Sequence, residues 1–465
     1  MLPKLITSIP GPRSQALMQE LHRYESPNIT YFSENFPIFW ERAEGTNVWD
    51  VDGNRFLDWT SGFGVASLGF QSLHLQSAIH HQSQKLWHAM GDVHPTEAKV
   101  NLCRELVKIT FERWGLQGKV ILGNSGFEAV EAALKTAHLA TGKPGVLAFE
   151  GSYHGLGYGA LDTTALPEFR EPFLAQLKTF TSFVPYPTCY RCPYQCTEGY
   201  RLIGEKAPDC SEYCLEKLEE EIRNTFKKKP IGAILVEPIQ GRGGVQIPPR
   251  DFLPLLRALA DEYEALLIVD EIYTGFWRTG TCFACEAEQV IPDIICLGKS
   301  LTGGFPLSAC VGRADLIDAW PRSTGEALHT STFLGNPLGC AMALASLEQW
   351  QNFDLWKKQL HHLEEKLRSA FFSLKENHAL LGNVRGKGAL WGLELIQTDG
   401  SPDPQITSQL MVQMLNEGFI FLAGGRHHNV LTLSPPFLIN EQEIQSTIRT
   451  LNTAIGGQLD HPPEK

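Results

Sequence analysis

Three charged side chains each follow an apolar run of strand length. Glu237, Asp270 and Lys299 stand at the carboxyl ends of these runs. A lone Asp in such a place can cap a helix, and a lone Lys commonly reaches solvent along its apolar stem. Two buried carboxylates are costly without a positive or hydrogen-bonding partner, so together they indicate a shared cationic ligand. A lysine opposite an Asp can also serve as a nucleophile toward a carbonyl carbon.

Two further strings follow apolar runs. Ser125, Gly126 and Phe127 precede an Ala-rich helical stretch, and small residues there can present backbone N–H groups to an anion. An ordinary strand-to-helix turn would have the same composition. Tyr153 and His154 follow another run, where an aromatic side chain beside a His could cover a flat ring or simply pack in a loop.

Taken together, these residues have the chemistry of a pyridoxal phosphate site. A lysine amine bonds to the cofactor aldehyde, and an Asp pairs with the pyridinium nitrogen and favours its proton. A glycine-containing turn before a helix receives the phosphate.

The runs that carry these residues are apolar at every position and alternate with helical stretches. They comprise residues 120–122, 145–149, 233–236, 266–269 and 294–297. Such runs are typical of strands buried on both faces, and their alternation with helices predicts a mostly parallel α/β sheet. Ligands of open α/β sheets bind beyond the carboxyl ends of the strands, where the charged residues stand.

The remaining segments divide the chain into expected domains. We expect residues 1–74 to belong to a smaller domain, residues 75–340 to form a large cofactor-binding domain, and residues 341–465 to complete a smaller α+β domain. The first 35 residues have no clear pattern and are predicted to be irregular. Residues 341–377 are predicted to form a pair of helices.

Composition narrows the class of protein. The chain has 465 residues, 43% of them hydrophobic, and a formal net charge of −12. A nucleic acid is excluded as the main partner because binding a phosphate backbone needs a basic face. No apolar stretch reaches the length of a membrane span or a signal peptide, so we expect a cytoplasmic enzyme without a membrane partner.

Eleven cysteines are present, and five of them crowd into an insertion at about residues 186–215. These five are Cys189, Cys192, Cys196, Cys210 and Cys214. Their spacing is compatible with a structural metal, and equally with small buried apolar side chains. The catalytic site itself is expected to need no metal.

In order and spacing, several strings resemble class III aminotransferases, which are pyridoxal phosphate enzymes of fold type I. Acetylornithine, ornithine and 4-aminobutyrate aminotransferases belong to this group. The strings comprise residues 124–129, 153–155, 237–241, 267–280, 298–299 and 329–338. The resemblance extends from about Pro37 to about Leu451.

The resemblance implies a role for each of the central residues. Lys299 would hold the cofactor as a Schiff base and then shuttle a proton, and Asp270 would pair with the pyridine nitrogen. Gly126 and Phe127 would donate backbone N–H groups to the phosphate, with Ser125 close by. The large domain would contain a seven-stranded type of sheet flanked by helices.

It also implies the surroundings of the cofactor ring. Tyr153, with His154 beside it, would cover one face of the ring, and Ile272 would close the other. Glu237 would act as a gate or a hydrogen-bond partner. Thr332 would reach the phosphate of the neighbouring subunit, so the active unit would be a homodimer with its sites at the interface.

The function implied is transfer of an amino group from an amino acid or ω-amine donor to a 2-oxo acid, either pyruvate or 2-oxoglutarate, with ping-pong kinetics. An amino-acid racemase, an epimerase or an aminomutase on the same fold is the alternative. A non-catalytic scaffold organised by the Cys-rich insertion is a more distant one, which the intact Lys299, Asp270 and Glu237 disfavour.

Two positions depart from the family pattern. Tyr273 stands where many relatives have a Gln that contacts the ring hydroxyl; the Tyr hydroxyl could replace that contact, or the contact could be absent. Thr432 stands where relatives that act on α-carboxylates often have an Arg, and Thr cannot form the same bidentate clamp. Either Arg426 takes that role, or the donor is not bound through an α-carboxylate.

Overall fold

The computed structural model describes residues 1–33, 35–194 and 211–460. It divides into two compact units, each described here by itself: residues 1–73 with 360–465, and residues 74–359. The division falls within the long helix α12 (Phe353–Asn377). No helix among the described residues is long and apolar enough to cross a membrane.

The second unit is built on a seven-stranded sheet, as predicted. Its strands occur in the order β4-β10-β9-β8-β7-β5-β6, and only β10 runs antiparallel to its neighbours. The strands are β4 (Gly118–Gly123), β5 (Gly145–Phe149), β6 (Thr181–Val184), β7 (Ile231–Val236), β8 (Leu266–Asp270), β9 (Ile294–Leu297) and β10 (Ser308–Arg313). The carboxyl ends of β4, β5, β7, β8 and β9 therefore meet at one edge of the sheet.

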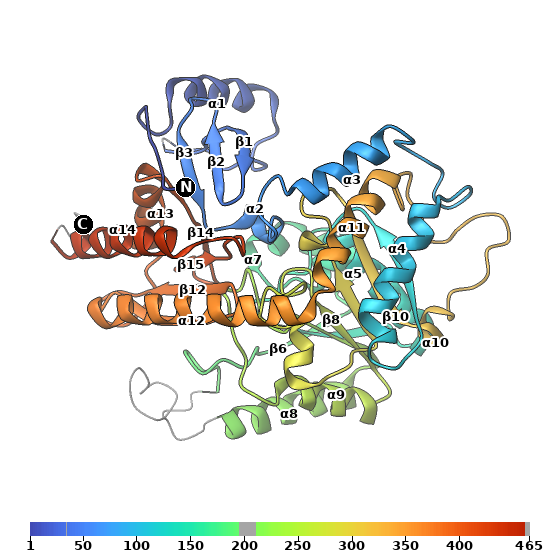
Figure 1. Cartoon of the computed structure of the whole chain (residues 1–465). Helices are drawn as coiled ribbons and strands as arrows, with labels where there is room; N and C mark the ends of the chain where they lie inside the picture. Colours follow the sequence, from blue (N-terminus) through green and yellow to red (C-terminus); the bar gives the residue numbers. More distant parts are fainter. Residues whose placement is uncertain (34, 195–210, 461–465) are drawn as a thin grey trace. The chain divides into compact units, whose positions relative to one another are not determined.

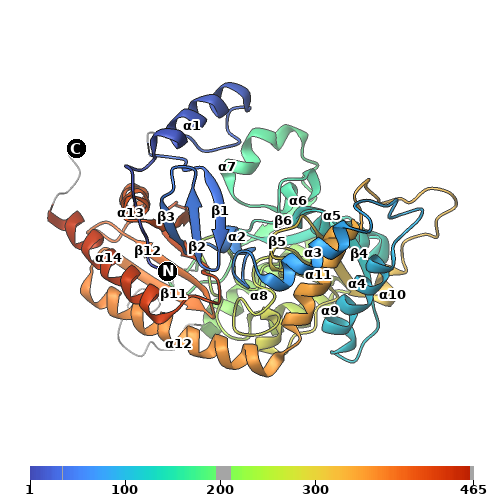
Figure 2. The same ribbon diagram turned by 45° about the horizontal axis from the view of Figure 1, so that its top comes forward.

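Helices cover this sheet (Figure 1). One face packs against α5 (Gly126–Thr141), whose inward positions are small and fully buried, Ala129 and Ala133 among them, so helix and strands approach closely. The other helical segments of the unit are α3 (Leu73–Ser83), α4 (Glu97–Val107), η1 (Lys108–Glu112), α6 (Tyr158–Thr163), α7 (Pro167–Arg170), η2 (Glu171–Gln176), α8 (Ser211–Lys228), α9 (Phe252–Glu262), η4 (Ala284–Glu288), η5 (Lys299–Leu301), α10 (Ala314–Ile317) and α11 (Pro337–Trp350). Figure 2 shows α3, α4 and α11 gathered at one side of the unit.

The first unit contains two small sheets, in the orders β1-β2-β3-β13 and β11-β12-β15-β14. Its strands are β1 (Trp40–Glu44), β2 (Asn47–Asp50), β3 (Arg55–Asp58), β11 (Leu381–Lys387), β12 (Leu390–Leu395), β13 (Phe419–Ile420), β14 (Leu422–Gly424) and β15 (Val430–Leu433). Its helices are α1 (Pro12–Tyr24), α2 (Ser61–Gly64), α13 (Pro404–Asn416) and α14 (Glu441–Asp460).

The expectation of an irregular N-terminal segment was wrong for residues 12–24. Pro12 opens α1 at a position where its missing N–H is no loss, and Arg23 complements the last turn. Ser14 is the only buried residue of this helix, and Leu17, Met18 and Leu21 lie half-buried at helical spacing. The prediction overlooked this short apolar stripe.

A buried carboxylate fastens the sheet at the edge opposite the charged residues. Asp293, just before β9, accepts hydrogen bonds from the backbone N–H of Leu267 (2.8 Å) and from Arg257 (2.7 Å) and Arg313 (3.1 Å). It thus links the start of β8 to the end of β10.

We expect Asp293→Ala to lower the free energy of unfolding by about 2–3 kcal/mol, because the buried N–H of Leu267 loses its acceptor while Arg257 and Arg313 each keep one other carboxylate partner. Thermal unfolding measures the effect. As a control, Asp318→Ala removes an exposed ion pair with Lys119 and should change stability by less than about 1 kcal/mol. Equal effects of the two variants would contradict this account of Asp293.

Candidate active site

A His–carboxylate pair lies at the carboxyl edge of the large sheet. Asp270 ends β8, and one of its oxygens contacts Nδ1 of His154 at 2.8 Å, while the backbone N–H of Ile272 donates to the other at 3.1 Å. The His154 side chain is fully buried, and its own backbone N–H donates to Thr164. The Asp270 carboxylate is therefore held in a fixed orientation beneath the site.

Glu237 follows β7 at the same edge and is buried. Its two oxygens accept hydrogen bonds from the backbone N–H groups of Tyr153 and Gly241, both at 3.0 Å. Burial raises the pKa of Glu237 to about 7, with the nearby Asp270 charge acting in the same direction and His154 opposing it. This carboxyl can therefore gain or lose a proton near neutral pH, besides joining the loops after β5 and β7.

Lys299 follows β9 with a backbone φ of +44°, a left-handed conformation uncommon for a residue with a side chain. Removal from water lowers its pKa to about 8, against the opposing effects of the Asp270 and Glu237 charges. The amine is thus available as a neutral nucleophile at much lower pH than an ordinary lysine.

The Tyr273 ring lies beneath this amine, with Lys299 Nζ 3.5 Å from the ring centroid. Gly241 makes room for that ring, because a Cβ at Gly241 would come within 2.3 Å of it. Tyr273 therefore supports the lysine by a cation–π contact. Whether its hydroxyl also takes the place of the Gln contact of relatives stays a prediction.

The start of α5 provides an anion site beside these groups. Gly126 and Phe127 are the first two helical residues, so their N–H groups have no acceptor within the helix. The Ser125 hydroxyl is buried and has no hydrogen-bond partner among the described residues. The Glu128 carboxylate orders the turn by accepting from the backbone N–H of Ser125 at 3.1 Å.

Ile272 closes the space between the two turns. A Cβ at Gly126 would lie 3.0 Å from its side chain, and one at Gly298 would lie 3.4 Å from it. These contacts suit the predicted place of Ile272 against one face of a flat ring. Together with the unpartnered Ser125 hydroxyl and the free helix N–H groups, the donor set fits pyridoxal phosphate.

Thr332 lies on the protein surface, in a segment whose neighbours are fastened to the second unit. Ser331 accepts a hydrogen bond from the Asn124 side chain at 3.1 Å, and Thr330 donates to Asp92 at 2.7 Å. An exposed Thr332 is compatible with contact to a second subunit, which stays a prediction.

Sequence reasoning missed two residues at this edge. Ser308, at the start of β10, donates to the backbone carbonyl of Ser125 at 2.6 Å and so steadies the turn before α5. Arg242, between two glycines after Glu237, stacks on the Tyr153 ring. A single charged residue inside a glycine-rich stretch was the available signal for Arg242, whereas Ser308 gave none.

Three of the five cysteines of the insertion lie within the described residues. Cys189 is exposed, Cys192 and Cys214 are buried, and Cys196 and Cys210 lie outside the described residues. Within residues 1–33, 35–194 and 211–460, no group of three or more His, Cys, Asp or Glu side chains is placed to hold a metal ion.

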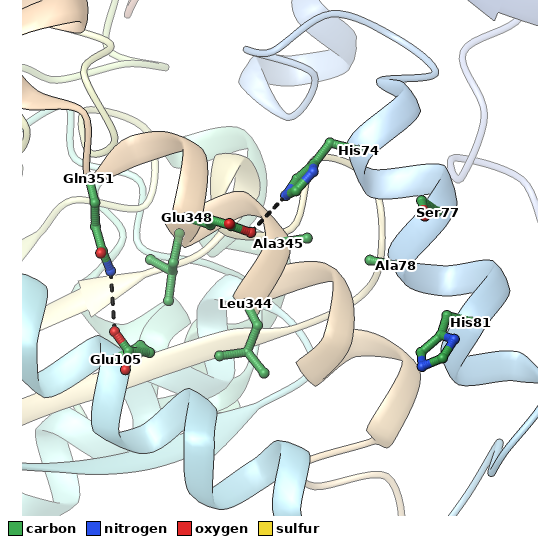
Figure 3. A pocket seen from close by; sticks show the side chains of 10 residues that line it. His74, Ser77, Ala78, His81, Glu105, Leu344, Ala345, Glu348 and Gln351 are labelled. Carbon is green, nitrogen blue, oxygen red and sulfur yellow. Dashed lines mark hydrogen bonds and ion pairs between the residues drawn. The ribbon is translucent and has the colours of Figure 1, made fainter.

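A separate surface pocket lies between α3, α4 and α11 (Figure 3). His74 and Glu348 form an ion pair across it at 3.1 Å, and Gln351 donates to Glu105 at 3.3 Å. None of the strand-edge residues lines this pocket, so it is not the candidate active site.

Comparisons with known proteins agree with this geometry. The family model for class-III aminotransferases matches residues 30–455. Alanine/serine racemase of Pyrococcus horikoshii is 31% identical over 465 residues, covering 100% of this chain and 94% of its own length. The 4-aminobutyrate aminotransferase of Escherichia coli is 34% identical over 423 residues, which make up 90% of this chain and 93% of that protein. A similar solved structure is that of an amine transaminase from an uncultivated Pseudomonas species with pyridoxal phosphate bound. It matches with a TM-score of 0.83 at 28% sequence identity, over 94% of this chain and 98% of that one.

The raised pKa of Glu237 predicts a pH-dependent effect of Glu237→Gln in the cofactor-free protein. Between its ordinary pKa of 4.5 and about 7, the folded state binds the extra proton, so this contribution to stability is present at low pH and lost as the pH rises through 7. The free energy of unfolding of the variant, relative to that of wild type, should therefore rise by about 2 kcal/mol from pH 5 to pH 8. Chemical denaturation at both pH values tests this, and an unchanged difference would contradict it.

The ring beneath Lys299 predicts different effects of two Tyr273 substitutions. Tyr273→Leu removes the π face that favours the ammonium, so the pKa of Lys299 should fall further, by about 0.5–1 pH unit. Tyr273→Phe keeps the ring and should stay near the wild-type value of about 8. The pKa of Lys299 is measured from the pH dependence of its labelling by an amine-reactive reagent, with peptide mass spectrometry to quantify the labelled peptide. Equal midpoints in the two variants would rule out the ring contact.

Proposed function

Since the chain belongs to the class-III aminotransferase family and is a pyridoxal phosphate-dependent enzyme, we propose that it transfers an amino group from an amino acid or ω-amine to a 2-oxo acid through Lys299. The observation that carries the proposal is the meeting of three groups at one strand edge. These are the Lys299 amine with its lowered pKa, the Asp270–His154 pair and the open start of α5.

Pyridoxal phosphate, when bound, supplies an aldehyde that condenses with amines and a ring that withdraws electrons from the carbon being deprotonated. Its phosphate would be held by the N–H groups of Gly126 and Phe127 with the Ser125 hydroxyl. Its ring would lie between Tyr153 and Ile272, with the Asp270 carboxylate facing the ring nitrogen.

Lys299 has two tasks in this mechanism. Its Nζ would be the atom that holds the cofactor, and as a free amine it would take up a proton at Nζ from the substrate carbon and release it again. A pKa near 8 suits this second task because the amine is readily both protonated and deprotonated near neutral pH.

Asp270 has an electrostatic task. Its carboxylate favours a proton on the group it faces, and the hydrogen bonds from His154 and Ile272 fix its direction without filling the side open to the site. The carbonyl product leaves before the 2-oxo acid enters, so the kinetics are ping-pong.

The proposed active unit is a homodimer. Two neighbouring segments expose large apolar side chains: Trp87 (68% exposed) and Val93 (62%) in one, Leu328 (71%) and Phe333 (58%) in the other. Thr330 and Asp92 join these segments by a hydrogen bond. An exposed apolar surface beside Thr332 supports burial against a second copy, from which Thr332 would reach the partner's phosphate.

We propose that the enzyme is cytoplasmic. The nine cysteines among the described residues are all free thiols, which supports this because thiols stay reduced in the cytoplasm. The proposed substrates are small molecules, with neither a nucleic acid nor a membrane among the partners.

Racemisation of an amino acid is the second candidate, and the similarity to alanine/serine racemase favours it specifically. A racemase would return the proton to the opposite face of the same carbon and would need no acceptor. An epimerase would work in the same way, and an aminomutase would also return the amino group to its substrate.

We expect purified protein to be yellow with bound cofactor, and we expect an amino donor added without acceptor to bleach that colour as the cofactor takes up the amino group. Absorption spectra recorded with α-amino acids, ω-amino acids and diamines identify the donor class. Lys299→Ala should lose the lysine-dependent colour and slow the reaction at least about 1,000-fold.

Solvent deuterium separates the two candidates. A donor that exchanges its α-hydrogen and racemises without bleaching the colour would favour the racemase. A protein that takes up no pyridoxal phosphate would contradict both functions.

A further inference from the structure

Arg242 lies on an unusually rigid turn at the edge of the active site. From Ile231 to Val245 it is the only residue that is not buried. The turn is closed by reciprocal backbone hydrogen bonds between Gln240 and Gln246, both at 3.1 Å. This segment is therefore a buried turn, closed by backbone hydrogen bonds, from which one cationic side chain is exposed.

Three contacts fix this turn to the catalytic groups. The N–H of Gly241 donates to Glu237 at 3.0 Å, and the Gln240 side chain donates to the backbone carbonyl of Glu150 at 2.9 Å. A Cβ at Gly241 would collide with the ring of Tyr273. The backbone next to Arg242 therefore cannot move without disturbing Glu237 or Tyr273.

The guanidinium group is held by aromatic rings rather than by a carboxylate. Its central carbon lies 5.0 Å from the centroid of Tyr153 and 5.1 Å from that of Phe169. Among the described residues Arg242 has no ion pair, whereas Arg170, in the same neighbourhood, bonds to Asp162 at 3.3 Å. Arg242 is therefore oriented by stacking while its hydrogen-bond donors stay available.

The Arg242 charge acts on the catalytic lysine. Beyond desolvation, the influences on Lys299 include Arg242, whose positive charge contributes to lowering the pKa of that amine. Tyr153, on which Arg242 stacks, is the residue expected to cover the cofactor ring. A substrate group attached to the reacting carbon would accordingly come within reach of this arginine.

Guanidinium groups bind carboxylates through two parallel hydrogen bonds, and stacking on an aromatic ring is the other contact they favour. If the substrate is bound through an α-carboxylate, another residue has to supply such a group, because Thr432 occupies the position where relatives often carry an Arg. Arg426, the alternative from sequence, lies in the first unit, in the segment between β14 and β15.

We propose that Arg242 binds the carboxylate adjoining the reacting carbon, in both the amino-acid donor and the 2-oxo acid acceptor. The proposal rests on the proposed function and narrows it to carboxylated donors. Arg242 is in this sense a specificity-determining residue, and Tyr153 and Phe169 position it.

The test compares Arg242→Gln and Arg242→Lys with Arg250→Gln in the cofactor-loaded enzyme. Arg250 is an exposed arginine farther along the same loop and outside the site. Each amino acid that bleaches the cofactor is paired with the amine in which methyl replaces its carboxylate, as 2-aminopropane does for alanine. Binding of pyruvate and 2-oxoglutarate without donor is measured by calorimetry, which needs no turnover.

For Arg242→Gln we expect the KM of the amino acid to rise about 10- to 100-fold, and the affinity for both oxo acids to fall by a similar factor. The KM of the paired amine should change less than about twofold, since it has no carboxylate for the arginine. Arg242→Lys should lose less affinity than Arg242→Gln, because it keeps the positive charge but lacks the planar guanidinium that forms two parallel hydrogen bonds. Arg250→Gln should leave all of these values unchanged.

Two results would overturn the proposal. A parallel rise of KM for the amino acid and its paired amine would make Arg242 only a support for Tyr153. Oxo-acid binding that is absent from the wild-type enzyme, or unchanged in Arg242→Gln, would show that no carboxylate is bound there. Should oxo acids need Arg242 while no donor bleaches the cofactor, aminotransfer would fail and the carboxylate site would stand.

Discussion

The Asp270 carboxylate, nearly buried at the end of β8, depends on two hydrogen-bond donors for its place. Hydrogen bonds to a charged group contribute about 1.5–3 kcal/mol each, and without them a buried carboxylate is strongly unfavourable. One donor, His154, comes from the loop after β5, with β7 lying between β5 and β8 in the sheet. The alignment of these parallel strands therefore has to be kept, since a slip in register would separate His154 from Asp270.

The same constraint acts on the lysine. Lys299 follows β9, the strand on the other side of β8 from β7, and has a left-handed backbone conformation that costs about 1 kcal/mol or more. Its amine is drawn toward Asp270 and Glu237 and is supported by the Tyr273 ring, while desolvation opposes its charge. These opposing effects leave the amine near the midpoint of its titration at slightly alkaline pH, as a group that must both take up and release a proton requires.

Sequence was sufficient for the parts of the fold and site that follow from pattern. The five apolar runs all became strands of the large sheet, and the charged residues after them met at one edge. Four of these strands are buried at every position, whereas β4, which carries the run 120–122, is partly exposed at the edge of the sheet. Helix α1 was not predicted, because its apolar stripe is short and only half-buried. The His154–Asp270 contact joins residues 116 apart and depends on strand order, and the Lys299–Tyr273 contact depends on side-chain rotamers. The spacing of residues along the sequence predicts neither of these two contacts.

Of the two positions that depart from the family pattern, Tyr273 is expected to face the cofactor and Thr432 the substrate. Lys299, Asp270 and the start of α5, which are proposed to hold the cofactor, keep the family's residues. Arg242 lies on the turn whose Gly241 makes room for the Tyr273 ring, so the large aromatic side chain and the exposed guanidinium are accommodated by one piece of backbone. In the proposal, the turn after β7 supplies the cation that β15 lacks at Thr432, and a rigid turn holds such a group in a defined position. Burial of every other residue between Ile231 and Val245 provides that rigidity.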